Sequence, residues 1–197
     1  MASESKSQLI TYFNTGDKPT EANFTNLIDS SFNHVTDHHA IVVDDTHVNT
    51  VTAANVGTTT IPADTLMAGS VIKLHSSGVV IDNNSTDTLT PLFTLKHGST
   101  TVVLLTGAAL DVADSDIVNF ESTIQFRTVG ASGTFVAASR LFSDAAGGTQ
   151  LFTHNVSTAV ATNVAIELSA NMDWSVANAD NEYTHLIHTA QVFGSNA

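Results

Sequence analysis

The stretch FESTIQFR, residues 120–127, decides the fold class of this protein. Its even-numbered residues are mainly apolar, whereas its odd-numbered residues are all polar. Successive side chains of a β-strand point to opposite sides, so this alternation is typical of a strand with one face against a core. We therefore expect a β-strand here, and a protein built around a sheet.

Similar strand-like runs recur on both sides of this stretch. They lie at residues 50–60, 70–81, 89–96, 100–106, 118–128, 133–142, 149–154, 164–171 and 183–193. Turn-forming sequences such as HGST, GASG, DAAGG, DNNSTD and ANADN separate them. Eight or nine short strands without intervening helices predict a mainly β protein, with a jelly-roll β-sandwich over residues 58–197.

The first 34 residues follow a helical period instead. In SQLITYFN, residues 7–14, the apolar positions fall on about one helical face, and Gly16 and Pro19 end that helix. Thr20 is placed to cap a second helix with one apolar stripe. Residues 1–34 thus predict an αα-hairpin, which is too short to be stable alone and needs a surface to pack on.

The apolar residues of this hairpin are the candidate anchor to another protein. They are Phe13, Phe24, Leu27, Ile28 and Phe32. The same side chains could instead pack the hairpin onto its own sandwich, and the pattern alone does not separate the two roles.

The segment VTDHHAIVVDDTHVNT, residues 35–50, sustains neither period, so residues 35–57 are expected to form an extended linker or arm. This region is rich in possible metal ligands, namely His34, His38, His39 and His47 with Asp37, Asp44 and Asp45. His34 and His38 would share one face of a continued helix, but a zinc site needs three or four converging ligands and nothing fixes a third. We therefore expect a polar arm without a metal.

Other candidate sites are weaker. Asp111, Asp114 and Asp116 offer calcium-type oxygen ligands, but they lack the glycine and distal glutamate of an EF-hand loop and are ordinary turn residues. Trp174 and Tyr183 could form a sugar-stacking pair, although a lone tryptophan in a sandwich more often belongs to the core.

No catalytic motif stands out in the sequence. It contains no nucleophile elbow, HExxH or P-loop, and the glutamates 121, 167 and 182 are isolated from one another. GASGTF and AAGGTQ lack the strand-to-helix context of a phosphate-binding loop. We expect a protein that is not an enzyme and needs no cofactor.

The charge balance excludes several partners. Nineteen acidic residues against six basic ones give a net charge of −13, and the basic residues are scattered. Nucleic acids and anionic membranes require clustered Lys and Arg, so neither is expected as a partner. Charged residues make up only 13% of the chain, and the many Thr, Ser and Asn residues favour contacts with other proteins. Because the chain starts without a signal-like segment, we expect synthesis in the cytosol.

Two parts of the sequence carry a resemblance to known proteins. TYFNTGDKPTEANFTNLIDSSFNH, residues 11–34, resembles an N-terminal module of virion and tail-fibre proteins of tailed bacteriophages, with TGDKPTEANF as its specific part. The region from about Ile61 to Gly194 resembles small jelly-roll structural domains of such phages. The matching segments are IPADTLMAGSVIKLHSSGVV, TLKHGSTTVVLLTGAAL, IQFRTVGASGTFVAASRLF and IELSANMDWSVANADNEYTHLIHTAQVF.

The resemblance implies a non-enzymatic virion component, usually a homotrimer, made in the host cytoplasm and placed on the head or the tail. On the head it would be a capsid decoration or cement protein that binds the major capsid protein and stabilises the shell. The alternative is a short tail fibre, adaptor or receptor-binding knob that binds a tail protein and recognises host glycan. A carbohydrate-active domain unrelated to virions is a third possibility.

Overall fold

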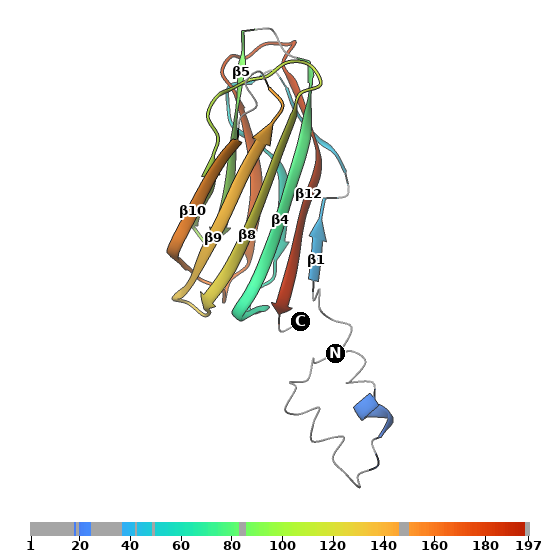
Figure 1. The fold of residues 1–197 in the computed structure, drawn as a ribbon, viewed down its shortest axis with the longest axis vertical. Helices are drawn as coiled ribbons and strands as arrows, with labels where there is room; N and C mark the ends of the chain where they lie inside the picture. Colours follow the sequence, from blue (N-terminus) through green and yellow to red (C-terminus); the bar gives the residue numbers. More distant parts are fainter. Residues whose placement is uncertain are drawn as a thin grey trace.

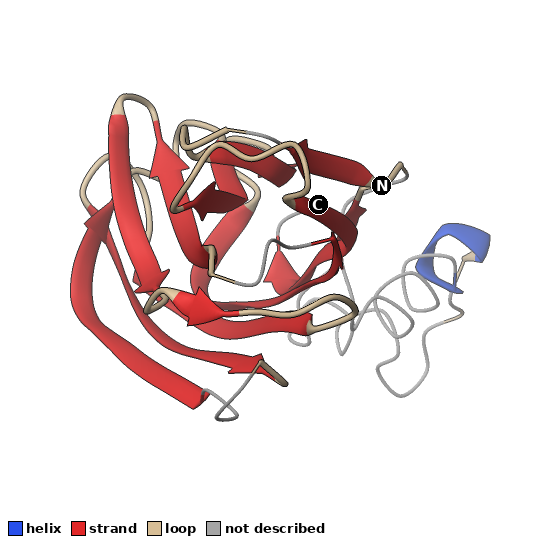
Figure 2. Ribbon diagram, turned by 90° about the horizontal axis from the view of Figure 1, so that it is seen from above, coloured by secondary structure: helices blue, strands red, loops and turns tan. Residues whose placement is uncertain are grey.

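Two antiparallel β-sheets packed face to face form the sandwich of this protein (Figure 1). The computed structural model describes residues 18, 20–24, 37–41, 43–48, 50–82, 86–145 and 150–195. Within these ranges strands dominate, so the prediction of a mainly β sandwich is confirmed. Seen from above, the strands enclose the core between two layers (Figure 2).

The strands are distributed unequally between the two sheets. The larger sheet has the order β1 (Asp37–Ala40), β12 (Glu182–Ser195), β4 (Leu66–Asp82), β8 (Ile117–Thr128), β9 (Gly133–Ser143) and β10 (Gln150–Val160), and β2 (Asp45–Val48) also pairs with β12. The smaller sheet has the order β3 (Ala54–Ile61), β11 (Ile166–Trp174), β5 (Thr88–His97) and β6 (Thr100–Thr106), and β7 (Leu110–Asp111) pairs with β5. The last strands of the chain, β11 and β12, therefore lie inside the sheets and not at their edges.

The core lies between the sheets and follows the alternation of FESTIQFR. Phe120, Ile124 and Phe126 are fully buried on the inner face of β8. Phe120 stacks on Phe93 of the smaller sheet, with ring centroids 3.8 Å apart and an interplanar angle of 3°. Burial of each such ring contributes roughly 2–3 kcal/mol, so contacts of this kind hold the two sheets together.

The beginning of the chain is described only in part. Residues 21–24 form a helical turn, and the backbone N–H of Asn23 donates a hydrogen bond to Thr20 Oγ1 at 3.3 Å. Thr20 therefore occupies the capping position that the sequence predicts. The remainder of the predicted αα-hairpin lies outside the described residues.

Residues 35–57 were expected to form a linker or arm, and the structure places much of this segment in the sandwich. β1 pairs with residues 189–192 of β12, β2 pairs with residues 182–185 of β12, and β3 begins at Ala54. The backbone is extended as expected, but it is hydrogen-bonded to the larger sheet. The sequence does not reveal these strands because four residues rich in Asp and His are too short to show an apolar alternation.

Candidate functional site

A shallow trough crosses the outer face of the larger sheet, and we call it the sheet trough. It is lined by two rows of cross-strand partners, one residue from each of β12, β4, β8, β9 and β10. The first row is Thr189, His75, Glu121, Arg140 and Phe152, and the second row is Gln191, Lys73, Thr123, Ala138 and His154. The strands that carry them lie side by side in Figure 1. Neighbouring strands are about 4.8 Å apart, so each row is about 19 Å long.

The trough is hollow because the middle residues of its second row are small. Thr123 and Ala138 lie side by side in the centre of the second row, whereas longer side chains stand at both ends. Two adjoining depressions result, with volumes of about 240 and 330 Å³, and Glu121 and Thr123 line both. Both depressions are open to solvent, which suits an extended ligand better than a small enclosed one.

A preformed ion pair occupies the middle of the first row. Arg140 Nε donates to Glu121 Oε2 at 2.7 Å, and Arg140 Nη2 donates to the same oxygen. The guanidinium also lies over the ring of Phe142, 4.8 Å from its centroid, which fixes its plane. Because the Arg140 and Glu121 side chains are 48% and 41% exposed, the pair adds at most about 1 kcal/mol to stability. Its unused N–H groups and carboxylate oxygen are available to a ligand.

Next to this ion pair stands an exposed aromatic ring. Phe152 is the cross-strand partner of Arg140 and is 62% exposed. Phenylalanine is usually buried, so a ring this exposed beside planar polar groups is typical of a contact surface. The ring forms one end wall of the depression that also contains His154.

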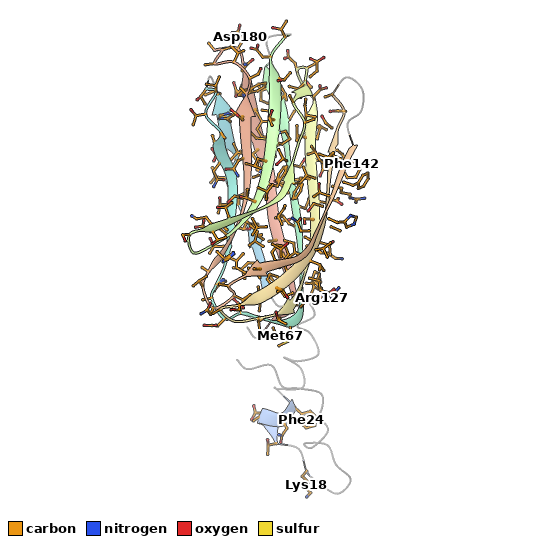
Figure 3. All side chains as sticks on the ribbon, turned by 90° about the vertical axis from the view of Figure 1, so that its left-hand side faces the viewer. Lys18, Phe24, Met67, Arg127, Phe142 and Asp180 are labelled. Carbon is orange, nitrogen blue, oxygen red and sulfur yellow. The ribbon has the colours of Figure 1, made fainter. Side chains whose placement is uncertain are left out.

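Positive charge is concentrated on this outer face. Three of the four Lys and Arg residues after position 40, namely Lys73, Arg127 and Arg140, belong to the outward-facing positions of β4, β8 and β9. Figure 3 shows Arg127 and Phe142 on the same side of the sandwich. Apart from the histidines, Lys73 and Arg140 bring two positive charges to the trough rows and Glu121 one negative charge, a net +1 in a chain of net charge −13.

A second polar cluster, the buried histidine network, lies in the core between the sheets. It consists of Tyr183, His185, Ser76, His188 and the carbonyl of Leu168. The distances are 3.1 Å from Tyr183 Oη to His185 Nδ1, 3.0 Å from His185 Nε2 to Ser76 Oγ, 3.1 Å from Ser76 Oγ to His188 Nδ1, and 2.9 Å from His188 Nε2 to the Leu168 oxygen. All four side chains are 0–1% exposed.

The Leu168 carbonyl sets the direction of every hydrogen bond in this network. Since a carbonyl only accepts, His188 Nε2 carries the proton and neutral His188 Nδ1 accepts from the Ser76 hydroxyl. Ser76 Oγ then accepts from His185 Nε2, and His185 Nδ1 accepts from the Tyr183 hydroxyl. With both histidines neutral, every one of these polar groups has a partner.

Burial keeps both histidines neutral. The pKa of His185 is lowered to about 4, mainly by burial and also by the neighbouring His188, while a backbone hydrogen bond at Ile187 acts in the opposite direction. Burial also lowers the pKa of His188 to about 4, although its bond to the Leu168 carbonyl acts in the opposite direction. The pKa of Tyr183 is raised by burial, so this hydroxyl stays protonated and donates.

A β-bulge and two glycines make room for the network. The register of β12 against β4 shifts between His185 and Ile187, which turns both histidines inward. A Cβ on Gly57 would lie 2.9 Å from His185 Cδ2, and one on Gly78 would lie 2.2 Å from Tyr183 Oη. The network is enclosed by protein, so a substrate could reach Ser76 only if the sheets opened.

Of the predicted anchor residues, the structure describes only Phe24. It lies on the helical turn and is 50% exposed. The other four, Phe13, Leu27, Ile28 and Phe32, lie outside the described residues. Their role as an anchor therefore stays a prediction.

The described histidine and aspartate side chains of residues 34–47 do not come together at one metal site. His47 is buried at the core and receives the Trp174 indole N–H on its backbone carbonyl at 3.4 Å. Burial lowers the pKa of His47, while Asp173 and Asp45 act in the opposite direction. His38 and His39 lie in β1, and His34 lies outside the described residues. The described part of the chain holds no group of three or more His, Cys, Asp or Glu side chains placed to bind a metal ion.

The candidate calcium ligands and the candidate sugar-stacking pair include residues that stabilise the fold. Asp116 Oδ2 accepts the backbone N–H of Ala113 at 2.6 Å, so this carboxylate stabilises the turn before β8. Trp174 and Tyr183 are 1% and 0% exposed, so both belong to the core and form no sugar-stacking surface. The interpretation of Trp174 as a core residue is confirmed.

Comparison with known proteins yields only distant similarities. No family model matches the chain, and no curated protein matches its sequence. One similar solved structure is the CBM2 module of the evolved Dit of Lactobacillus casei BL23 phage J-1, with 13% identity, a TM-score of 0.40, and coverage of 71% of this chain and 69% of that chain.

Two further similar structures come from infectious bursal disease virus. The Gt strain matches with 10% identity and a TM-score of 0.33 over 82% of this chain and 32% of that chain. The Gx strain matches with 10% identity and a TM-score of 0.30 over 81% and 42%. Similarities this weak assign no function. Within the described residues, no helix has the length and apolarity to cross a membrane.

Proposed function

We propose that this protein is a non-enzymatic structural protein of a tailed-phage virion, and that its sandwich is displayed to bind host glycan through the sheet trough. The observation that carries the binding role is the exposed Phe152 ring beside the Arg140–Glu121 pair in an open trough. Placement on a virion rests on the resemblance of TGDKPTEANF and of the four sandwich segments. This role corresponds to a tail fibre, adaptor or receptor-binding knob.

The strand order supports a jelly-roll interpretation of the sandwich. Four strands of the larger sheet have the order β2, β12, β4 and β8, and four of the smaller sheet have the order β3, β11, β5 and β6. Strands from the two ends of the chain thus lie side by side in both sheets, as in a double-sheet jelly roll. The hairpin of β9 and β10 extends the larger sheet beyond this set. It supplies four of the ten residues in the trough rows, namely Arg140, Ala138, Phe152 and His154.

A glycan suits the chemistry of the trough. Sugar rings have apolar C–H faces that pack on an aromatic ring, and their hydroxyl groups both donate and accept hydrogen bonds. The trough offers the Phe152 ring, donors on Arg140 and Lys73, and acceptors on Glu121 and Gln191. A nucleic acid would need many more positive charges than these rows provide.

Capsid decoration is the second candidate function. The exposed apolar residues of the sheet-edge strand β10 favour it, because Val156 is 78% exposed beyond the trough and suits contact with a neighbouring subunit. In this function a homotrimer would bind the major capsid protein through the hairpin residues, and the sandwiches would face outward. The same trimer could form on a tail.

Virion analysis tests the two placements. The tail function expects few copies per virion by quantitative gel analysis and labelling at the tail tip. Many copies per virion, with loss of heat or osmotic stability in particles that lack the protein, would establish capsid decoration instead. Light scattering of the purified protein tests the trimer, and a stable monomer at micromolar concentration would contradict it.

A further inference from the structure

We infer that the ligand of the sheet trough is an oligosaccharide that carries sparse acidic groups, either carboxylate or phosphate. One sugar ring packs on Phe152, and one acidic group pairs with Lys73. The inference rests on the proposed glycan-binding function and adds the chemical class of the glycan.

Lys73 is the reason that we infer an acidic group on the ligand. Among the described residues, the ion pairs join Arg140 to Glu121 and Lys96 to Glu167, and neither includes Lys73. Lys73 Nζ lies 5.4 Å from the centroid of the Phe193 ring, so the ammonium contacts an aromatic ring near one end of the trough. Its partners along the second row, Gln191 and Thr123, are uncharged. An anionic ligand group would complement this charge.

The distance between Phe152 and Lys73 is the reason that we infer an oligosaccharide and not a single sugar. Phe152 lies on β10 and Lys73 on β4, and the strand order places β9 and β8 between them. Three strand spacings amount to about 14 Å, which is wider than a single sugar ring. The small side chains of Thr123 and Ala138 leave the floor between the two ends open for the middle units of the ligand.

The overall charge of the protein limits how acidic the ligand is. The rows carry a net +1, whereas the whole chain carries −13, so the field beyond the trough repels anions. A densely charged polyanion would lose more from this repulsion than it gains at Lys73. A glycan in which acidic units alternate with neutral ones avoids that cost.

The test uses the full-length protein on a glycan array and by calorimetry with three probes. The probes are hyaluronan hexasaccharide with carboxylates, a phosphomannan oligosaccharide with phosphates, and neutral chitohexaose. We expect the protein to bind the hyaluronan or the phosphomannan oligosaccharide, and the comparison of these two probes shows whether the acidic group is a carboxylate or a phosphate. The neutral oligosaccharide should bind at least about tenfold more weakly. Equal binding of neutral chains would overturn the acidic class but leave the proposed glycan function intact. Absence of any glycan binding across the array would overturn both.

Matched variants locate the ligand. Lys73→Gln should weaken acidic-oligosaccharide binding about tenfold, whereas Lys96→Gln on the opposite sheet should leave it unchanged. Phe152→Ala should abolish binding, whereas Val156→Ala on the same strand should preserve it. Melting temperatures show that each variant is folded. Unchanged affinity in folded Lys73→Gln or Phe152→Ala would overturn the site.

Discussion

His185 and His188 are the two residues that make this protein sensitive to acid. Each is buried in a hydrogen-bond network that is complete only when both rings are neutral. A proton on His188 would reverse the donors along the network and leave the Tyr183 hydroxyl proton without its acceptor. A second proton would place two positively charged rings in the core with their centroids 5.8 Å apart, so the two rings titrate as a coupled pair.

We predict that folding stability falls as the pH is lowered from about 6.5 to about 4. In this pH window the two histidines bind protons in the unfolded protein but not in the folded protein. Their contribution to stability is therefore complete above the pKa that they have in the unfolded protein, and it is lost as the pH falls to the pKa that they have in the folded protein. The loss amounts to at most about 3 kcal/mol for each ring. Denaturant titrations at a series of pH values measure it. The upper half of this pH window tests the histidines specifically, because the carboxylates stay ionised there. An unfolding free energy that does not change with pH in that range would contradict the prediction.

Ser76 is the residue on which the network depends most. Its hydroxyl joins the two histidines, so Ser76→Ala leaves both His185 Nε2 and His188 Nδ1 without partners in the core. We expect a loss of roughly 2–6 kcal/mol in unfolding free energy, since each of the two unpaired buried groups costs about 1–3 kcal/mol.

Ser122→Ala is a matched control for this change. Ser122 is also buried in the larger sheet, but its hydroxyl forms one bond, to Ser139 Oγ at 2.9 Å. Its replacement should cost about half as much or less, because only one hydroxyl loses its partner. Equal losses for the two variants, measured by urea denaturation, would show that the network adds nothing special.

At the scale of the elements, periodicity predicted the strands that have one face on the core. The nine predicted ranges correspond to β3, β4, β5, β6, β8, β9, β10, β11 and β12, with ends that differ by a few residues. The second half of β10 was missed because the register shifts between Asn155 and Thr158, which breaks the alternation. The short strands β1, β2 and β7 were missed because two to four residues carry no period.

The two short strands β1 and β2 should stabilise the sandwich. They pair with β12, and the His47 carbonyl accepts the buried Trp174 indole N–H. A protein lacking residues 1–49 should therefore melt at a lower temperature than one lacking residues 1–36, by several degrees. The comparison isolates β1 and β2 because both variants lack the same first segment. Equal melting temperatures would show that this part of the sequence is only an arm, as its composition suggested.

For the molecule as a whole, the candidate site was harder to predict than the fold. The outward residues of FESTIQFR include Glu121 and Thr123, and TFVAASRLF contains Arg140, so the sequence displays the right residue types. It does not display the register that aligns Arg140 with Glu121 on one side and Phe152 on the other. That register depends on turns and bulges, and a shift of one residue would turn these side chains into the core.

The central position of β12 gives a prediction for the whole fold. β12 pairs with β1 and β2 on one side and with β4 on the other, and it carries three residues of the buried histidine network. A protein that ends before residue 182 should fail to form the sandwich, because the larger sheet would be divided and the core opened. Removal of residues 196–197 alone is the control. Circular dichroism and cooperative melting measure the outcome, and a cooperative transition in the shorter protein would contradict the prediction.

The same position of β12 has a consequence for how the protein is made. A ribosome delivers β12 after the other strands of the sandwich, so those strands wait with unpaired edges until β12 emerges. The larger sheet is then completed only once β12 has left the ribosome. Products that terminate before β12 would stay unfolded and be degraded, so only polypeptides that include β12 become available for assembly.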